Sequence, residues 1–240
     1  MTAYHAEEGP YRLRRPGDAL WPPRDRAYGG QVETVWRKVA WAGLGVARLV
    51  LPVTLLITLL AAAYLYSDIW FAMNGTATNA TVAVSDLILP MTWFAIHLTN
   101  RRYGAGYAFA QLVAALAMGV GFVLFNPSDI DHWMAVSPLL TARAIIAFCG
   151  AFFLANAIAI VFFDGARGPR WWTAPMTASF AAAFVFSAVY YPAAFAGADT
   201  DWTDSALTHF LVFAAESILL LIPYYLLRSA MRPLPGLNGY

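Results

Sequence analysis

The sequence predicts an all-α polytopic membrane protein, a bundle of six transmembrane helices with both termini in the cytoplasm. Charged residues make up only 12% of the 240 residues, against about 25% in a soluble domain. Hydrophobic residues make up 60%, and the mean hydropathy is +0.56. Six apolar runs are long enough to cross a bilayer, and basic residues gather in the segments on one side of them.

The chain divides into a polar tail at residues 1–40, a transmembrane domain at 41–230 and a short C-terminal tail at 231–240. The first tail is rich in Pro, Gly and Arg, a composition that cannot bury a core, and it shows no cleavable signal peptide. From Glu33 to Trp41 apolar residues alternate with basic ones, which indicates a short interfacial helix.

Six spans follow, each about as long as a helix needs to cross the hydrocarbon core. The hairpin from Arg143 to Phe195 is the element around which we expect the others to pack. Its two runs are uncharged, and the Gly, Pro, Arg and Trp residues of the connector 164–175 end both helices at the interface. The predicted spans are 43–66, 83–99, 105–125, 139–163, 173–195 and 206–228.

The distribution of basic residues predicts the orientation. Apart from Arg48 and Arg143, every Lys and Arg lies in the first tail, the turn at 100–104, the connector at 164–172 or the C-terminus. The other three loops hold no Lys or Arg, and they carry aspartates instead. By the positive-inside rule both termini are cytoplasmic, which agrees with an even number of spans.

Several classes of chemistry lack the residues that they need. Cys149 is the sole cysteine, which excludes an internal disulfide and a cysteine-based metal site. Lys38, the sole lysine, lies outside the spans, which excludes a retinal Schiff base. Walker, GxGxxG and HExxH motifs are absent, as are clustered haem or copper ligands. We therefore expect no enzyme activity, no cofactor, no metal and no nucleic-acid partner.

Polar groups inside the spans are the candidate functional residues, because burying an ionisable group in hydrocarbon is costly. Glu216 lies near the middle of the last span and shares one helical face with His209 and Phe213 through i, i+4, i+7 spacing. A carboxylate at this depth can bind an amino-bearing substrate or carry a proton. The structural alternative is an ion pair with Arg143 or a protonated, hydrogen-bonded side chain.

Five further polar residues are candidates. Arg143 lies one turn inside the outer end of its span, where snorkelling or pairing with a carboxylate is the structural interpretation. His97 and His209 lie at opposite depths, so they cannot share one metal or haem. Asn156 is the one strong hydrogen-bonding side chain of its span and can bind a ligand or join helices. Asp86 is expected to be exposed at the outer interface.

Aromatic side chains in the spans can stack on a planar ligand, although most aromatic residues in such chains pack or line the interface. These residues are Trp93, Tyr103, Phe180, Phe184, Tyr190, Tyr191, Tyr224 and Tyr225. The predicted substrate-binding set is Glu216, Asn156, His97, His209, Arg143 and Tyr190.

Several segments resemble those of one transporter family, in order and at compatible spacing. The stretch Leu89–Ala105, with its Leu98-Thr99-Asn100-Arg101 run before Tyr103-Gly104, resembles the second-span signature of the queuosine-precursor transporters, the vitamin uptake transporter family. Arg143–Ala147 together with Asn156–Phe163 is similar to the family's fourth span. Arg170–Pro175 is similar to its connector, and Leu221–Tyr225 to the end of its last span.

The resemblance covers about residues 45–230 and implies a six-helix bundle that imports 7-deazaguanine precursors of queuosine. Asn156 matches the amide of the family's fourth span, whereas Glu216 is peculiar to this chain. Other polar pocket positions of the family, acids among them, are matched here by His97, Ala159, Ala183, Phe186 and His209.

We therefore predict a transporter of the bacterial inner membrane that imports a small planar metabolite, a 7-deazaguanine queuosine precursor or a similar purine-like molecule. Glu216 and Asn156 are expected to bind its polar edge in a pocket between the helices, with His97 and His209 flanking the route. Pro90 and Pro223 are expected bending points.

The alternative is a non-transporting integral membrane subunit of a larger complex, built on the same scaffold. Its partners would be other membrane subunits, or further copies of the chain. A stripe of small residues offers such partners a docking face. The stripe consists of Ala110, Ala114, Ala117 and Gly121.

Overall fold

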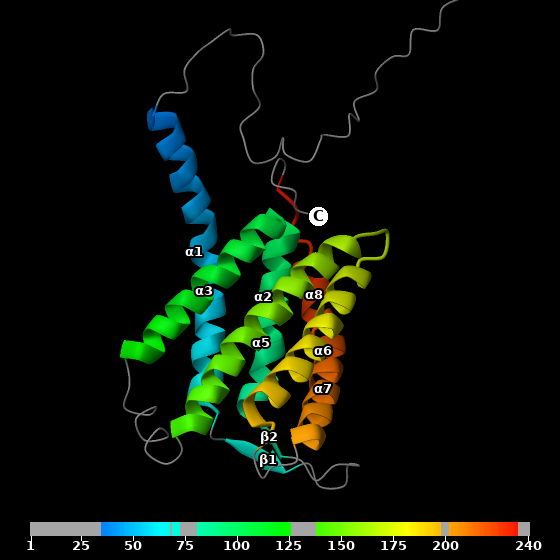
Figure 1. Ribbon diagram of the computed structural model, residues 1–240. Coiled ribbons are helices and arrows are strands. Elements are labelled where there is room, and N and C mark those ends of the chain that lie inside the picture. Colours follow the sequence, from blue (N-terminus) through cyan, green and yellow to red (C-terminus); the bar gives the residue numbers. More distant parts are fainter. Residues whose placement is uncertain (1–34, 68, 73–80, 126–137, 198–201, 235–240) are drawn as a thin grey trace, which may run out of the picture.

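The computed structural model describes residues 35–67, 69–72, 81–125, 138–197 and 202–234. Its long helices form one bundle, with a small β-hairpin at one end (Figure 1). In chain order the elements are α1 (Val35–Leu65), β1 (Trp70–Ala72), β2 (Thr81–Ala83), α2 (Val84–Tyr103), α3 (Ala105–Phe125), α5 (Pro138–Gly165), α6 (Thr173–Phe195), α7 (Trp202–Leu219) and α8 (Leu221–Leu227).

Within the described residues, five helical segments are long and apolar enough to cross a membrane. Five of the six predicted spans are therefore confirmed as membrane-compatible helices, and the chain has the character of a multi-pass membrane protein. The segments are Ala42–Leu65, Ala105–Phe122, Thr141–Gly165, Thr173–Phe195 and Trp202–Leu227, the last of which combines α7 and α8.

The remaining predicted span, 83–99, corresponds to α2, which has 20 residues and is much more polar than the other long helices. It carries Asp86, His97 and Asn100 as well as two arginines in its last turn. Helices α1, α3, α5, α6 and α7 all pack against it, so that it runs through the inside of the bundle (Figure 1). A helix enclosed by other helices need not be apolar all round, and this accounts for its low hydropathy.

Helices α5 and α6 form the expected hairpin and make the most extensive contact in the bundle. Each carries a stripe of buried alanines at four-residue spacing, which places small side chains on one face and lets neighbouring helices approach closely. On α5 the stripe is Ala147, Ala151, Ala155 and Ala159, and on α6 it is Ala174, Ala178 and Ala182.

The membrane-compatible part of α1 begins at Ala42, close to the predicted start of the membrane domain at residue 41, but the helix itself is longer. Helix α1 starts at Val35 and continues through the span to Leu65 without a break. The expected interfacial helix at Glu33–Trp41 is thus, from Val35 on, the first part of a 31-residue helix. Proline first occurs in this helix at Pro52, so nothing in its first turns breaks it.

The all-α prediction missed the short antiparallel hairpin of β1 and β2, which pairs Trp70 with Ala83 and Ala72 with Thr81. Its strands have only three residues each, too few for the alternation that predicts a strand from sequence. Val82 and Ala83 are almost fully buried, so β2 packs into the bundle directly before α2 begins.

The last predicted span, 206–228, is two helices. Helix α7 begins earlier, at Trp202, and ends at Leu219, and α8 follows from Leu221. The break falls just before Pro223, which has no N–H to donate to the preceding turn. The helix is therefore interrupted near one of the two expected bending points, whereas Pro90 lies inside the uninterrupted α2.

The C-terminal segment returns to the end of α2. The Leu234 N–H donates to the Arg102 carbonyl at 3.1 Å, and Arg102 Nη1 donates to the Ala230 carbonyl at 3.0 Å. The predicted tail therefore packs on the bundle through its first four residues, 231–234, and the other six, 235–240, lie outside the described part. The start of α1 and the end of the described chain lie at the same end of the bundle (Figure 1).

We expect Ala178→Leu to lower the free energy of unfolding by about 1–3 kcal/mol, because the larger side chain overfills a buried helix contact. Ala188→Leu is the matched control, since Ala188 is exposed on the same helix. Thermal unfolding of both variants in detergent micelles, followed by circular dichroism, would measure the difference. Equal effects of the two substitutions would contradict close packing at Ala178.

Candidate functional site

Eight side chains in the described part of the chain keep a buried polar atom without a hydrogen-bond partner. Four of them are Arg101, Gln111, Arg167 and Ser187. Of the other four, Trp93 and His97 lie on α2, Asn156 on α5 and Glu216 on α7. The atoms are Trp93 Nε1, His97 Nδ1, Asn156 Oδ1 and Glu216 Oε2. Folded proteins pair nearly all buried polar atoms, so such a group indicates a site for a ligand or for water. We call these four residues the central polar cluster.

Ring contacts place the α2 and α7 members at similar depth. The Trp93 ring meets the Phe213 ring edge-on, with centroids 5.5 Å apart. Phe213 is three residues before Glu216, and His97 is four residues after Trp93, so each pair is separated by about one turn of its helix. Phe213 also contacts Phe186 of α6 at 5.8 Å, which brings α6 to the same level.

Phe163 of α5 contacts His97, and Asn156 lies about 10 Å away from Phe163 along the same helix. The Phe163 ring stacks on the His97 ring, with centroids 5.3 Å apart. The Asn156 amide Nδ2 donates to the Phe152 carbonyl at 2.8 Å, which leaves only the side-chain oxygen unpaired. The side chain is fully buried, so this oxygen faces the protein interior.

His97 has one satisfied ring nitrogen and one without a partner. Its Nε2 lies 3.0 Å from Ser179 Oγ on α6, and both side chains are buried. Because a serine hydroxyl both donates and accepts, this contact leaves Nδ1 able to serve as donor or acceptor. Sequence reasoning missed Ser179, since a lone serine in an apolar span carries no distinguishing signal.

His209 lies outside this cluster, toward the other end of α7. Its Nε2 is 2.9 Å from Asp86 Oδ2 and its Nδ1 is 2.7 Å from the Ser205 carbonyl. Asp86 was expected at the exposed interface, but only 18% of its side chain is accessible. The expectation missed two partners, since the same Oδ2 also accepts a hydrogen bond from the Ala83 N–H at 2.8 Å.

Arg143 caps the C-terminal end of α6, and its partners in the described part of the chain are backbone carbonyls. Its guanidinium donates to the carbonyls of Ala193 at 2.6 Å, Ala196 at 2.8 Å and Pro192 at 3.3 Å. The last carbonyls of a helix lack partners within the helix and carry its negative dipole end, so a cation is favourable there. This geometry supports the structural interpretation of Arg143.

Tyr190 is part of a packed aromatic group between α5 and α6. Its ring lies 5.3 Å from the Phe186 ring, 6.1 Å from Phe148 and 5.0 Å from Tyr191. The predicted binding set thus separates into two groups. His97, Asn156 and Glu216 belong to the central polar cluster. His209, Arg143 and Tyr190 have other partners, nearer the end of the bundle where the β-hairpin of β1 and β2 lies.

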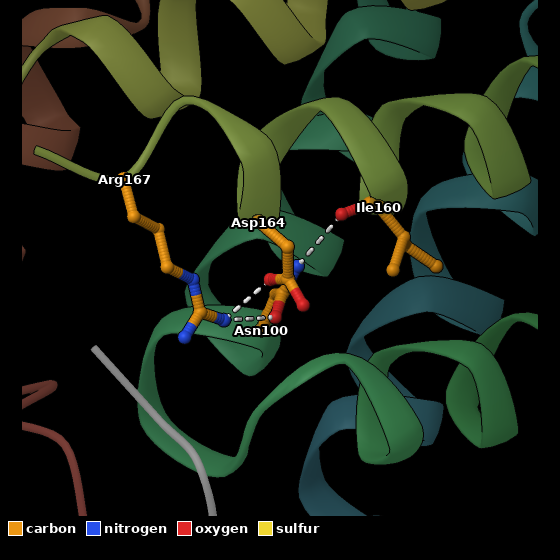
Figure 2. Close-up of polar contacts among 4 residues, drawn as sticks. All are labelled: Asn100, Ile160, Asp164 and Arg167. Carbon is orange, nitrogen blue, oxygen red and sulfur yellow. Dashed lines mark hydrogen bonds and ion pairs between the residues drawn. The ribbon is translucent and has the colours of Figure 1, made fainter. Parts of the chain in front are cut away.

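A second polar network lies at the opposite end, where α2 and α5 finish (Figure 2). Asn100 is fully buried; its Nδ2 donates to the Ile160 carbonyl at 3.4 Å, and its Oδ1 accepts from Arg167 Nη2 at 3.0 Å. Arg167 also forms an ion pair with Asp164. The network ties α2 to α5 and its connector, and sequence reasoning did not identify it as a contact.

Among the described residues, no three His, Cys, Asp or Glu side chains gather as a metal site would require. The central polar cluster instead offers a set of hydrogen-bonding atoms: one indole donor, two oxygen acceptors and one imidazole nitrogen. Such a set can recognise the polar edge of an organic ligand.

Comparison with known proteins finds no match, whether with protein-family models, curated proteins or solved structures. The functional interpretation therefore depends on the residues of this chain and their geometry. The resemblance to queuosine-precursor transporters stays a hypothesis drawn from short segments.

We expect Asn100→Leu to lower the free energy of unfolding by about 1–3 kcal/mol, because it leaves buried partners of Asn100 without their hydrogen bonds. Thr177→Val is the control, since the exposed Thr177 hydroxyl bonds only to carbonyls of its own helix. Chemical unfolding in micelles measures both variants. Indistinguishable midpoints would show that the network does not hold α2 against α5.

Proposed function

We propose that this chain is a transporter that imports a small planar metabolite across the bacterial inner membrane. The observation that carries the proposal is the central polar cluster, whose buried donors and acceptors have no hydrogen-bond partner in the described part of the chain and lie within the membrane-compatible helices or α2. Transporter binding sites typically lie near the middle of the bilayer, between helices of the bundle. A chain whose only role was packing would be expected to satisfy these atoms internally.

The unpaired atoms favour a ligand with a mixed polar edge. Asn156 Oδ1 and Glu216 Oε2 can accept from ring N–H and amino groups, and Trp93 Nε1 can donate to a carbonyl oxygen. A 7-deazaguanine base carries these groups side by side on one edge. The aromatic side chains of Trp93, Phe163 and Phe213 around the cluster suit its flat faces. We therefore propose a purine-like ligand.

The proposed orientation places the end where α2, α5 and α8 finish in the cytoplasm, with six spans including α2. Arginines gather at that end, as the positive-inside rule requires of cytoplasmic segments. Arg143, at the opposite end, is engaged by helix carbonyls. The arginines at the proposed cytoplasmic end are Arg101, Arg102, Arg167, Arg170, Arg228 and Arg232.

The test is uptake of a radiolabelled 7-deazaguanine base into liposomes that contain the purified full chain. Binding should weaken by about tenfold to hundredfold in both Glu216→Gln and Asn156→Leu, because the first replaces one carboxylate oxygen by an amide donor and the second removes a buried acceptor. Rescue of queuosine in the tRNA of a strain that neither makes nor imports the precursor gives an independent measurement in cells.

Asp204→Asn is the matched control for Glu216→Gln, because Asp204 is an exposed carboxylate at the start of the same helix. It should transport as the wild type does. If the wild-type chain inserts into the membrane but neither binds nor transports the base, the proposed ligand is wrong. Co-purification of other membrane subunits would then favour the alternative role in a larger complex.

A further inference from the structure

Both ring nitrogens of His209 face oxygen atoms that can only accept hydrogen bonds. Nδ1 lies 2.7 Å from the Ser205 carbonyl, and Nε2 lies 2.9 Å from Asp86 Oδ2. A neutral imidazole has a single N–H, so it can donate to one of these oxygens but not to both. If Asp86 is ionised and His209 is neutral, the ring nitrogen without a proton directs its lone pair at a lone pair of the oxygen that it faces.

An additional proton resolves the conflict. Either His209 is an imidazolium that donates from both nitrogens to an ionised Asp86, or Asp86 is protonated and its O–H donates to Nε2. The two arrangements differ only in which atom holds the proton. In both, one proton lies between Asp86 Oδ2 and His209 Nε2, and the Ala83 N–H donates to the same carboxyl oxygen.

Asp86 and His209 are enclosed at the end of the bundle where the β-hairpin of β1 and β2 lies. His209 is 6% exposed, and its ring packs 5.0 Å from the Tyr191 ring and 6.1 Å from the Phe213 ring. The buried residues Val82 and Ala83 of β2 immediately precede α2 and Asp86. In the described part of the chain, the titratable and charged groups on the surrounding helices include Arg143, Tyr190, Tyr191, Asp204 and Glu216.

Protonation of the pair controls a link between two helices that also build the central polar cluster. Asp86 lies on α2 and His209 on α7, as do Trp93 and Glu216 respectively. Loss of the shared proton leaves one N–H for two acceptors, so either the α2–α7 hydrogen bond to Asp86 or the bond to the Ser205 carbonyl within α7 is lost. The position of the two helices is thereby coupled to proton occupancy.

We propose that Asp86 and His209 form a proton-binding site on the outer side of the bundle that couples transport to the proton gradient. This inference rests on the proposed function. One proton enters the pair from outside while the ligand binds at the central polar cluster. It leaves toward the cytoplasm as the α2–α7 contact opens and the ligand is released, so that each ligand moves with one proton.

The proton itself is tested without any ligand, on the full chain in lipid nanodiscs. Histidine is labelled with 15N, and His5→Gln, His97→Gln and His132→Gln together leave His209 as the sole imidazole. At neutral pH we expect either an imidazolium spectrum or a hydrogen-bonded Nε2 together with a carboxylic-acid infrared band from Asp86. Asp86→Asn should give a neutral imidazole, because its amide N–H can donate to Nε2 without an additional proton.

The coupling is tested in liposomes with the labelled 7-deazaguanine base as probe. An acidic exterior should drive accumulation by up to about tenfold for each pH unit of gradient, since one proton moves with each neutral base. Asp86→Asn and His209→Gln should lose this accumulation but still exchange labelled for unlabelled base in the absence of a gradient. Retained exchange shows that the variants are folded.

Gradient-driven accumulation that survives in both variants would overturn the proposal, as would a neutral His209 beside an ionised Asp86 in the spectra. If the wild type exchanges base but ignores the gradient, the coupling is wrong while the proposed function stands. If the wild type exchanges no base, the proposed function fails and the spectra alone decide whether the pair holds a proton. If the transport variants do not fold, the spectra again decide whether Asp86 and His209 hold a proton.

Discussion

The enclosure of α2 is the constraint on which the rest of the structure depends. Lipid cannot hydrogen-bond a polar side chain, so a helix that carries Asp86, His97 and Asn100 must find its partners in protein. The apolar helices α1, α3, α5, α6 and α7 supply that surrounding. Their outward faces contact the hydrocarbon, and their inward faces meet the polar helix. The two conditions together give a bundle with a polar interior and an apolar exterior.

Much of this architecture could be predicted from the sequence, because a long uncharged run has few alternatives to a helix in a membrane. The hairpin of α5 and α6, the break before Pro223 and the inward face of His209, Phe213 and Glu216 all follow from spacing and composition. The start of α1 at Val35 did not follow, because charged residues such as Arg37 and Lys38 end a hydrophobic run but do not end a helix.

The site was predicted in part, and the limit is again physical. Sequence identified His97 and Asn156 as interior polar residues but not Asp86, and it does not show which partner each residue meets. For Arg143 the sequence allowed either a carboxylate partner or a position at the interface. The side chain binds the carbonyls of α6, and a residue pattern does not predict contacts with backbone groups. Asp86 and His209 are 123 positions apart, so only the tertiary arrangement shows that they touch.

Helix α1 has a mechanical consequence for how the protein can be handled. A 31-residue helix is about 46 Å long and exceeds a hydrocarbon core of about 30 Å by several turns. Its first turns therefore stand clear of the other helices as a rigid rod (Figure 1). The opposite terminus is tied to α2 through Leu234 and Ala230. A fluorescent or affinity fusion is thus better tolerated ahead of α1 than directly after Leu234, where it would strain the attachment to Arg102.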